Sequence, residues 1–465
     1  MKWVILLFAL SLATELSSAA AVPTTFFGAT VSDSLPSNGI VLGGLGKVGG
    51  IIGHWVEATC DGGTNPSNSC YKWSGVDSWV NKATANNLTV VYDFGIPGWQ
   101  CGQGSTTDCT VLPTNLTYLT NFATALATRY YGKIHYYETG NEVNVSPNWT
   151  DSCSNLVLAH NTIYAAIKAV DPTAIVGAPN LAAYNGTKTG GGACVSSPNA
   201  AGNVASIWLS NFLATKDSNG HYPTVDSVGV HTYANGISTS LDGCDITNYA
   251  LGCAGAPLLH LYNSFRSVMT TAGLTSAPLL VTEGGFGADS QTSASPYGCS
   301  TSPYDATACL SPSQQVAYVG RWLVLSASTY ADGNGQLANW YGFDYDWGTL
   351  NGSYGMNSQN ATAYGQMESW ISGANFSRQC QTGTPSTVYV CDFTNAGQQY
   401  EIVFNDNNGV TAAYTAPTWA TKYQPLLGTA QPISGGTISV GDTPILLAVG
   451  VQPPPSPTKL TAVVK

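Results

Sequence analysis

Strand-like segments alternate with helix-like segments along most of this chain, and this alternation limits its possible folds more than any other feature. Eight short runs rich in aromatic and β-branched residues are each followed by a helical pattern or by a loop that contains one. Such an order is typical of parallel strands joined by crossover helices, and it predicts an α/β fold, a (β/α)8 TIM barrel. A doubly wound sheet is the alternative, but the eighth strand and the aromatic strand ends favour closure. The predicted strands are 26–31, 50–55, 88–94, 133–144, 174–178, 225–233, 278–284 and 338–345.

The predicted helices show apolar residues at helical spacing and end at glycine or proline signals. One example is 116–131, where Leu119, Phe122, Ala123 and Leu126 form an apolar stripe and Gly132 ends the helix. The predicted helices are 73–86, 116–131, 155–170, 205–214, 258–271, 314–328 and 364–371.

The texture of the sequence changes near residue 375, where short strand-like runs separated by Gly, Asn and Asp turns replace the alternation. We therefore expect a catalytic (β/α)8 barrel over 22–374 and a small antiparallel, β-sandwich-like domain over 375–450. The Pro-rich stretch 451–465 is typical of a linker or tail.

The first 21 residues predict a secretory signal peptide. Lys2 precedes the apolar run 4–10, and Ala19-Ala20-Ala21 forms a small-residue cleavage site. All twelve cysteines follow that site, which predicts disulfides in an exported protein. Close neighbours suggest local pairing, although spacing does not fix it: Cys60/Cys70, Cys101/Cys109, Cys244/Cys253, Cys299/Cys309 and Cys380/Cys391, with Cys153/Cys194 left over.

Eight Asn-x-Ser/Thr sequons predict a glycoprotein if the source glycosylates exported proteins. They are Asn87, Asn115, Asn144, Asn148, Asn185, Asn351, Asn360 and Asn375.

The charge pattern argues against nucleic-acid and membrane partners. Charged residues make up only 9% of the chain, the net charge is −11, and no basic cluster occurs. A surface rich in Ser, Thr, Asn, Gly and Tyr suits a neutral, hydroxyl-rich ligand, so we expect an oligosaccharide or polysaccharide. No metal or other cofactor is expected, because neither C-x-x-C nor H-E-x-x-H occurs. The match of 44–49 to G-x-G-x-x-G is discarded, because a strand-like run and not a helix follows this Gly-rich turn.

Two predicted strands end in glutamate, Glu142 in KIHYYETGNEVN and Glu283 in PLLVTEGGFG. Strand ends at the carboxyl face of a barrel are where active sites form. Hydrolysis of a glycosidic bond with retention needs two carboxyl groups about 5–5.5 Å apart, one as nucleophile and one as proton donor. The pair therefore predicts a glycosidase, and Glu138 is expected to be a hydrogen-bonded carboxylate inside the barrel.

These segments, together with YKWSGVDSWVNKATANNLTVVYDFG, VDSVGVHTY and GGTISVGDTPILLAV, resemble clan A retaining glycoside hydrolases, most of all family 39. The resemblance implies that Glu142 is the general acid/base and Glu283 the nucleophile. It also implies that Asn141 binds the sugar 2-hydroxyl by a hydrogen bond. His231 and Tyr233 would lie beside the nucleophile, and Trp340 would form a platform for the sugar ring. Trp99 and Trp347, in loops after the third and eighth strands, are further candidates for stacking on sugar rings.

The chain departs from the family pattern at two places. Gly140 and Val143 flank Asn141-Glu142 where Trp and Pro are common, and Gly284-Gly285 follow Glu283 where bulkier residues are common, which suggests an unusual subsite. The prediction is a secreted enzyme that cleaves a β-glycosidic bond. The alternatives are a non-catalytic carbohydrate-binding or cell-wall protein on the same barrel and an unrelated barrel hydrolase or lyase. A uronic-acid substrate would require a basic residue in the pocket, for which Lys47 and Arg321 are candidates.

Overall fold

The main sheet of this protein closes into a barrel of parallel strands. The structure is a computed structural model that describes residues 20–30, 45–48, 63–103, 108–144, 148–182, 194, 205–234, 257–286, 312–333, 335–340, 359–406 and 409–450. The strands of this sheet are β1 (Phe27–Thr30), β2 (Leu45–Val48), β3 (Thr89–Asp93), β4 (Ile134–Glu138), β5 (Ile175–Gly177), β6 (Leu181–Ala182), β7 (Val228–Ala234), β8 (Leu279–Phe286) and β9 (Gly335–Trp340).

The order of strands in the sheet is β5-β4-β3-β2-β1-β9-β8-β7-β6, and the pairings between them are parallel. Its two ends, β5 and β6, belong to one short segment of chain. β5 pairs with β4, β6 pairs with β7, and a bridge joins Gly177 to Ser227. The nine strands therefore occupy eight positions of a closed barrel, which confirms the predicted (β/α)8 fold.

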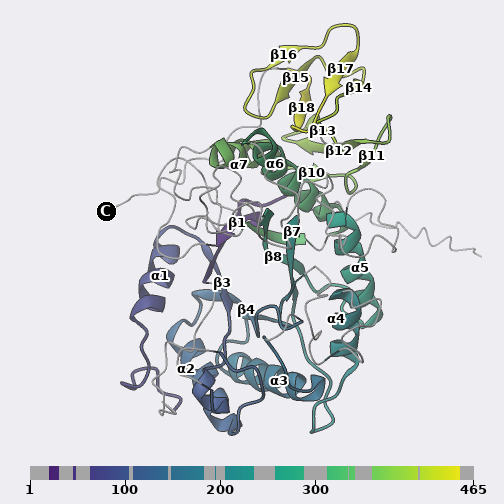
Figure 1. Ribbon diagram of the computed structural model, residues 1–465. Coiled ribbons are helices and arrows are strands. Elements are labelled where there is room, and N and C mark those ends of the chain that lie inside the picture. The colour runs from purple at the N-terminus through teal and green to yellow at the C-terminus, as the bar shows by residue number, and fades with distance from the viewer. Residues whose placement is uncertain are drawn as a thin grey trace, which may run out of the picture.

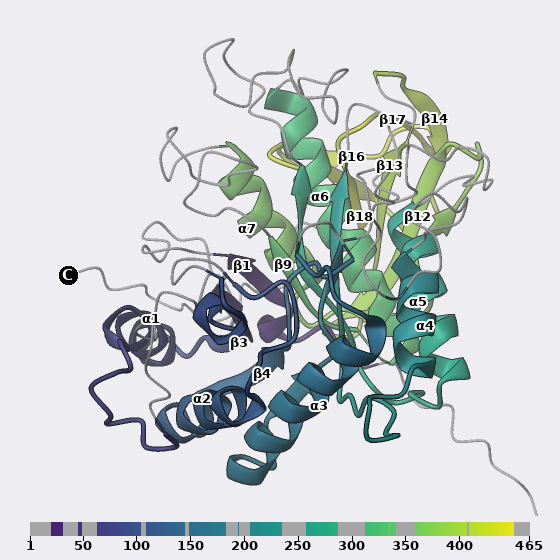
Figure 2. The same cartoon turned by 60° about the horizontal axis from the view of Figure 1, so that its bottom comes forward.

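Helices surround this sheet, as Figure 2 shows. They are α1 (Ser74–Ala85), α2 (Leu116–Arg129), α3 (Cys153–Val170), α4 (Ala205–Ala214), α5 (Pro257–Thr271), α6 (Pro312–Ser328) and α7 (Gln359–Ile371), with short 3-10 turns η1 (Thr24–Phe26), η3 (Gly98–Cys101) and η5 (Thr329–Asp332). Side-chain caps begin two of the helices. The Asn115 side chain accepts from the Thr117 N–H, and the Ser152 side chain accepts from the Asn155 N–H.

One prediction about the barrel was wrong. The Gly-rich segment expected to be a turn contains the second strand, Leu45–Val48, which pairs with β1 on one side and β3 on the other. Hydrogen bonding to two neighbours fixes this strand, and such pairing can override weak local propensity. The expected second strand, 50–55, lies outside the described residues. The last strand, β9, begins at Gly335, three residues before its predicted start.

Inside the barrel, an apolar layer lies below a polar one. Val91, Leu280 and Leu337 form a buried cluster of their own, against which Tyr136 packs. Further along the strands lie Glu138, Asn180 and Asn339, which are all buried. The polar layer therefore occupies the carboxyl-terminal part of the strands, where barrel enzymes bind substrate.

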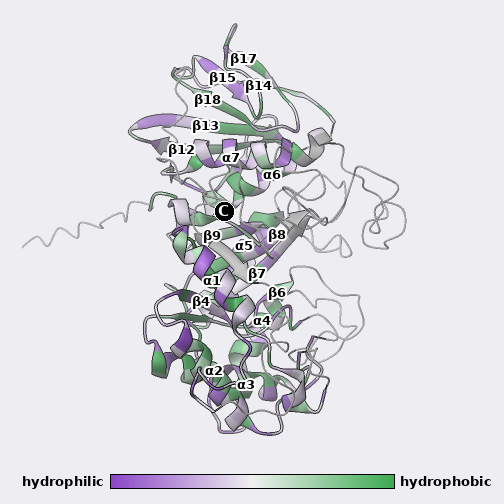
Figure 3. Cartoon of the chain, turned by 90° about the vertical axis from the view of Figure 1, so that its left-hand side faces the viewer, coloured by the Kyte–Doolittle hydropathy of each residue, from purple (hydrophilic) through white to green (hydrophobic). Residues whose placement is uncertain are grey.

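The C-terminal strands pair antiparallel, as expected for a small β domain. They are β10 (Asn375–Phe376), β11 (Gln381–Thr382), β12 (Val388–Asn395), β13 (Gln398–Asn405), β14 (Ala412–Thr415), β15 (Lys422–Pro425), β16 (Gln431–Pro432), β17 (Thr437–Val440) and β18 (Ile445–Ala448). Helices α6 and α7 lie between these strands and the barrel (Figures 1 and 3).

Arg321 of α6 joins the helix layer to the C-terminal strands. Its fully buried guanidinium donates to the backbone carbonyls of Asp442 (2.7 Å) and Asn405 (2.9 Å), and it lies 3.3 Å from the Asp442 carboxylate. Burial raises the pKa of the nearby Asp406 to about 7. Arg321 therefore stabilises the contact between α6 and the C-terminal strands.

The disulfides support the expected local pairing. The structure contains Cys101–Cys109, Cys153–Cys194 and Cys380–Cys391, and Cys70 is also disulfide-bonded. The remaining predicted pairs include residues outside the described part of the chain. Among the described helices, none combines the length and apolar character needed to cross a membrane.

Candidate active site

Glu142 lies in the loop after β4. The strand ends at Glu138, four residues earlier than the expected tip. Glu142 has a positive φ of 42°, an uncommon conformation for a residue other than glycine. Its backbone N–H donates to Oδ1 of Asn180 at 2.6 Å, and its side chain is 19% exposed. The backbone of Glu142 is therefore fixed by Asn180, while its carboxylate remains accessible to a ligand.

Glu283 lies within β8, where a register shift turns its side chain toward the site. Val281 pairs with Val230, but the next pair along is His231 with Glu283, so Thr282 is an extra residue in this strand. Leu280 faces the barrel interior, and strict alternation from it would turn Glu283 outward together with Val281. The irregularity reverses that alternation, as β-bulges beside active sites commonly do.

His231 of β7 joins the two glutamates. Its Nδ1 lies 2.9 Å from Oε1 of Glu142 and 3.2 Å from Oε2 of Glu283. The imidazole is fully buried, and the Glu283 side chain is only 9% exposed. The three groups each offer an atom within 4.8 Å of the other two. The two carboxylates thus approach one another closely enough to act on the same bond.

The same three side chains could hold a divalent transition metal, because imidazole and carboxylate are ligands such ions accept. A carboxylate pair of this separation can also deliver a nucleophile and a proton to one sugar without any metal. The geometry is thus sufficient for acid/base and nucleophilic chemistry by side chains alone.

Two groups near the tip of β4 were not predicted from the sequence. Asn180, just before β6, donates from Nδ2 to Oε2 of Glu138 at 2.9 Å, so Glu138 is the interior hydrogen-bonded carboxylate that was expected. His160 of α3 lies 2.7 Å from the Thr139 hydroxyl and 2.8 Å from the carbonyl oxygen of Thr224. The available signal for Asn180 was its position two residues past a predicted strand.

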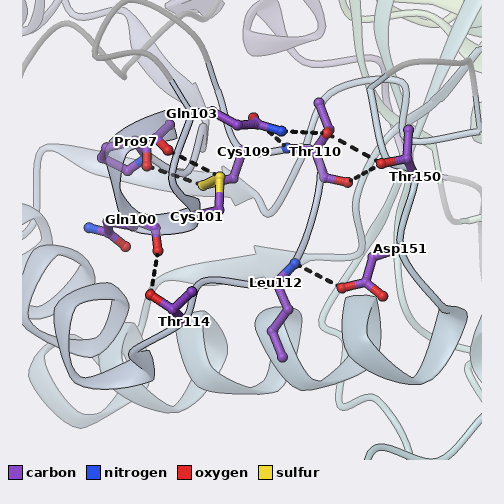
Figure 4. Close-up of a disulfide and its surroundings, with 11 residues drawn as sticks. Pro97, Gln100, Cys101, Gln103, Cys109, Thr110, Leu112, Thr114, Thr150 and Asp151 are labelled. Carbon is purple, nitrogen blue, oxygen red and sulfur yellow. Dashed lines mark hydrogen bonds between the residues drawn. A yellow bond between two sulfur atoms is a disulfide. The ribbon is translucent and has the colours of Figure 1, made fainter.

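The loop after β3 carries Trp99. The Cys101–Cys109 disulfide closes this loop, and Thr110 joins it to Thr150 in the segment before α3 (Figure 4). The Trp99 ring packs on Tyr118 of α2, with ring centroids 5.4 Å apart. Its predicted contact with substrate stays a prediction.

The other predicted binding residues have different placements. The side chain of Asn141 is exposed beside Glu142 and can therefore reach a ligand. The ring of Trp340 is fully buried and meets Trp322 of α6 edge-on, with centroids 5.2 Å apart. Tyr233 belongs to β7 opposite Gly285, but its side chain and the whole of Trp347 lie outside the described residues. The sugar-binding roles of these residues stay predictions.

Gly284 faces α6, so it does not contribute to the unusual subsite that the sequence suggested at Gly284-Gly285. A Cβ built on it would lie 2.5 Å from Cζ2 of Trp322 and 2.7 Å from the Thr232 hydroxyl. Trp322 also donates from Nε1 to that hydroxyl at 3.0 Å. Glycine is therefore needed here because a larger residue would prevent α6 from packing closely on β8.

Arg321 is not a pocket residue, because its guanidinium is held between α6 and the C-terminal strands. The side chain of Lys47 lies outside the described residues. Arg321 is thus removed as a candidate for binding a substrate carboxylate.

Comparisons with known proteins show similarity to glycoside hydrolases. Residues 58–307 match the family described as cellulase (glycosyl hydrolase family 5). No curated protein matches the chain significantly.

Solved structures of glycoside hydrolases resemble the chain over most of its length. A family 39 glycoside hydrolase from Bacteroides cellulosilyticus WH2 has a TM-score of 0.63 at 15% identity, covering 92% of this chain and 81% of that one. A glucosidase from Croceicoccus marinus has a TM-score of 0.55 at 10% identity, covering 92% and 98%. A family 30 endoxylanase from Clostridium papyrosolvens C71 has a TM-score of 0.52 at 14% identity, covering 93% and 97%.

At these identities the structural likeness shows a shared fold. Families 5, 30 and 39 are all clan A glycoside hydrolases, which confirms the resemblance noted in the sequence. The family match covers more than half of the chain. The chain therefore belongs to the cellulase family, glycosyl hydrolase family 5, and is a glycosidase built on a (β/α)8 barrel.

Proposed function

We propose that this protein is a secreted retaining glycoside hydrolase that cleaves β-glycosidic bonds of an oligosaccharide or polysaccharide. The observation that carries the proposal is the convergence of Glu142 and Glu283 on Nδ1 of His231, with donor atoms within 4.8 Å. That spacing suits double displacement and leaves too little room for the water an inverting enzyme places between its carboxyls, which lie about 6.5–9.5 Å apart.

In the first step the Glu283 carboxylate attacks the anomeric carbon, while the Glu142 carboxyl gives its proton to the leaving oxygen. The glycosidic bond breaks and a glycosyl ester forms on Glu283. In the second step Glu142 takes a proton from water, the resulting hydroxide attacks the anomeric carbon, and the ester bond breaks. Both residues thereby return to their starting protonation states.

His231 orients both carboxyl groups, because its single nitrogen lies within hydrogen-bonding distance of each. An Nδ1–H there stabilises whichever carboxylate carries the negative charge. Asn141, exposed next to Glu142, is the proposed partner of the sugar 2-hydroxyl.

The substrate we expect is neutral. Arg321 is committed to the C-terminal interface, and the chain as a whole is acidic. A site without a described basic side chain favours a hydroxyl-rich sugar over a uronic acid.

Export rests on the signal-like N-terminus and the disulfides. Among the described sequons, Asn87, Asn115 and Asn375 have exposed side chains and are the best placed to carry glycans. The Asn144 amide instead bonds to the backbone of Ala182.

The decisive experiment is covalent trapping with 2-deoxy-2-fluoro glycosides of glucose, xylose and galactose that carry a dinitrophenyl leaving group. These probes form the glycosyl-enzyme and slow its hydrolysis. Peptide mapping is expected to find the sugar on Glu283. A label on another carboxylate would overturn the assignment, and glycan binding with neither labelling nor turnover would favour the carbohydrate-binding alternative.

A further inference from the structure

The conformation of Glu142 has to be maintained by its surroundings. A φ of 42° in a residue with a Cβ costs about 1–2 kcal/mol relative to ordinary backbone. Such a residue keeps its conformation only where neighbouring contacts fix it. The contacts that fix Glu142 come mainly from asparagine side chains.

Asn180 makes the most direct of these contacts. Its Oδ1 accepts the Glu142 N–H at 2.6 Å, and its own backbone N–H donates to the Gly140 carbonyl at 2.9 Å. The side chain is fully buried. Asn180 therefore binds the loop on both sides of Asn141 and sets the direction in which the Glu142 side chain leaves the backbone.

Glu138 fixes the amide orientation of Asn180. A carboxylate oxygen of Glu138 accepts from Nδ2 of Asn180 at 2.9 Å, which leaves Oδ1 of Asn180 to accept from the Glu142 N–H. Gly229 of β7 leaves the space that this carboxylate occupies, because a Cβ at that position would overlap Oε1 of Glu138. The buried carboxylate of Glu138 thus favours the orientation in which Oδ1 of Asn180 points toward the loop that carries Glu142.

Two more asparagines complete the arrangement. Asn144 donates from Nδ2 to the Ala182 carbonyl (2.9 Å) and accepts from the Ala182 N–H (3.0 Å), as a neighbouring strand residue would. Asn148 donates from Nδ2 toward the carbonyls of Asn141 (3.3 Å) and Glu142 (3.2 Å). The peptide units around Glu142 are therefore held from both faces.

We propose that Asn180, with Asn144 in support, is the positioning residue for the general acid/base, and that the Glu138–Asn180 pair holds Glu142 in line with the leaving oxygen. This inference rests on the proposed function. A displacement of a catalytic group by about 1 Å can cost 10²-fold in rate. The loss should be confined to substrates whose leaving group needs a proton.

The test compares phenyl and 2,4-dinitrophenyl β-glycosides of glucose, xylose and galactose, using the sugar that the wild type hydrolyses fastest. Dinitrophenolate leaves without protonation, whereas phenolate needs help from the acid. For Asn180→Ala we expect kcat/KM to fall about 10²-fold on the phenyl glycoside and less than about threefold on the dinitrophenyl glycoside. Asn144→Ala should show the same pattern with a smaller loss, and it keeps the test valid if Asn180→Ala folds poorly.

Asn395→Ala is the matched control. This buried asparagine also donates to a backbone carbonyl, that of Ser372, but in the C-terminal strands. Its variant should lose stability without any dependence on the leaving group. Equal losses on both glycosides for Asn180→Ala and Asn144→Ala, or no loss, would overturn the inference.

Glu142→Ala, measured alongside, separates this inference from the proposed function. If Glu142→Ala shows the leaving-group dependence and the asparagine variants do not, only the positioning role fails. If Glu142→Ala also lacks it, the assignment of Glu142 as acid/base fails first.

Discussion

Glu142 and Glu283 meet at one nitrogen, Nδ1 of His231, although one lies in the loop after β4 and the other lies in β8. One ring nitrogen carries at most a single hydrogen, so an Nδ1–H at this position is shared between the two carboxyl groups. A pair of carboxyl groups in which one is ionised and the other protonated is the starting state that retaining hydrolysis needs.

Replacing Glu283 by Gln removes the nucleophile while keeping the size of the side chain. Turnover should fall by about 10⁴-fold or more, because no glycosyl-enzyme can form. Steady-state rates on dinitrophenyl glycosides measure this loss, and circular dichroism checks the fold. Full residual activity in a folded variant would remove Glu283 from the mechanism.

Replacing Gly284 by Ala should destabilise the protein by about 1–3 kcal/mol, because the new methyl group would press on the Trp322 ring. The strand that carries Glu283 would shift, so activity should fall as well. Gly365→Ala in α7 is the matched control. No atom lies within 4 Å of its added Cβ, and alanine should stabilise the helix by about 0.5–1 kcal/mol. Denaturant unfolding of both variants measures the contrast, and a stable Gly284→Ala protein would contradict this packing.

Glu368 of α7 should make the protein less stable as the pH rises. Burial raises the pKa of Glu368 from 4.5 to about 9, and within the described residues neither carboxyl oxygen has a hydrogen-bond partner. The folded state therefore binds more protons than the unfolded state between these values, and stability falls as the pH increases through that window.

Glu368→Gln removes this penalty. Its stability relative to wild type should increase with pH and reach about 3 kcal/mol near pH 7, at 1.36 kcal/mol per pH unit above the unfolded value. Urea unfolding between pH 5 and pH 8 measures the difference. A difference that does not change with pH would show that the carboxyl is not kept protonated by the fold.

His160 has the opposite dependence on pH. Burial lowers the pKa of His160 from 6.5 to about 4, so the unfolded state binds more protons in this window and stability is lost as the pH falls through it. His160→Gln should be less stable at neutral pH and should lack this part of the acid-induced loss. His221, whose side chain is 74% exposed, supplies the control for the change of side chain: His221→Gln should leave stability at neutral pH within about 0.5 kcal/mol of wild type. Thermal unfolding at half-unit steps from pH 4 to pH 7 tests both.

Much of the architecture could be predicted because it depends on local patterns. The helix at 205–214 was predicted with the bounds that α4 has, and the helix at 116–131 begins where α2 begins. Apolar stripes, caps and glycine stops act over one or two turns, so a single sequence reveals them. The disulfides between near neighbours, such as Cys380–Cys391, follow the same logic.

The composition of the candidate site was visible in the sequence, but its geometry was not. Strand-end positions singled out Glu142, Glu283 and His231 because parallel strands deliver their carboxyl ends to one face of a barrel. The side on which Glu283 emerges depends on an extra residue, Thr282, that only pairing with β7 reveals. Asn180 was overlooked because its role depends on contacts with Glu138 and Glu142, which are remote in the sequence.

The sequence by itself determined the order of strands and helices, the acidic and hydroxyl-rich character of the chain, and the two glutamates. Tertiary structure decided that Leu45–Val48 is a strand, that Glu283 faces the site, and that Glu142 adopts a positive φ. The physical reason is the distance along the chain over which each kind of interaction acts. Propensity and periodicity act between neighbours along the chain, whereas register, strand irregularities and side-chain hydrogen bonds exist only once distant segments have come together.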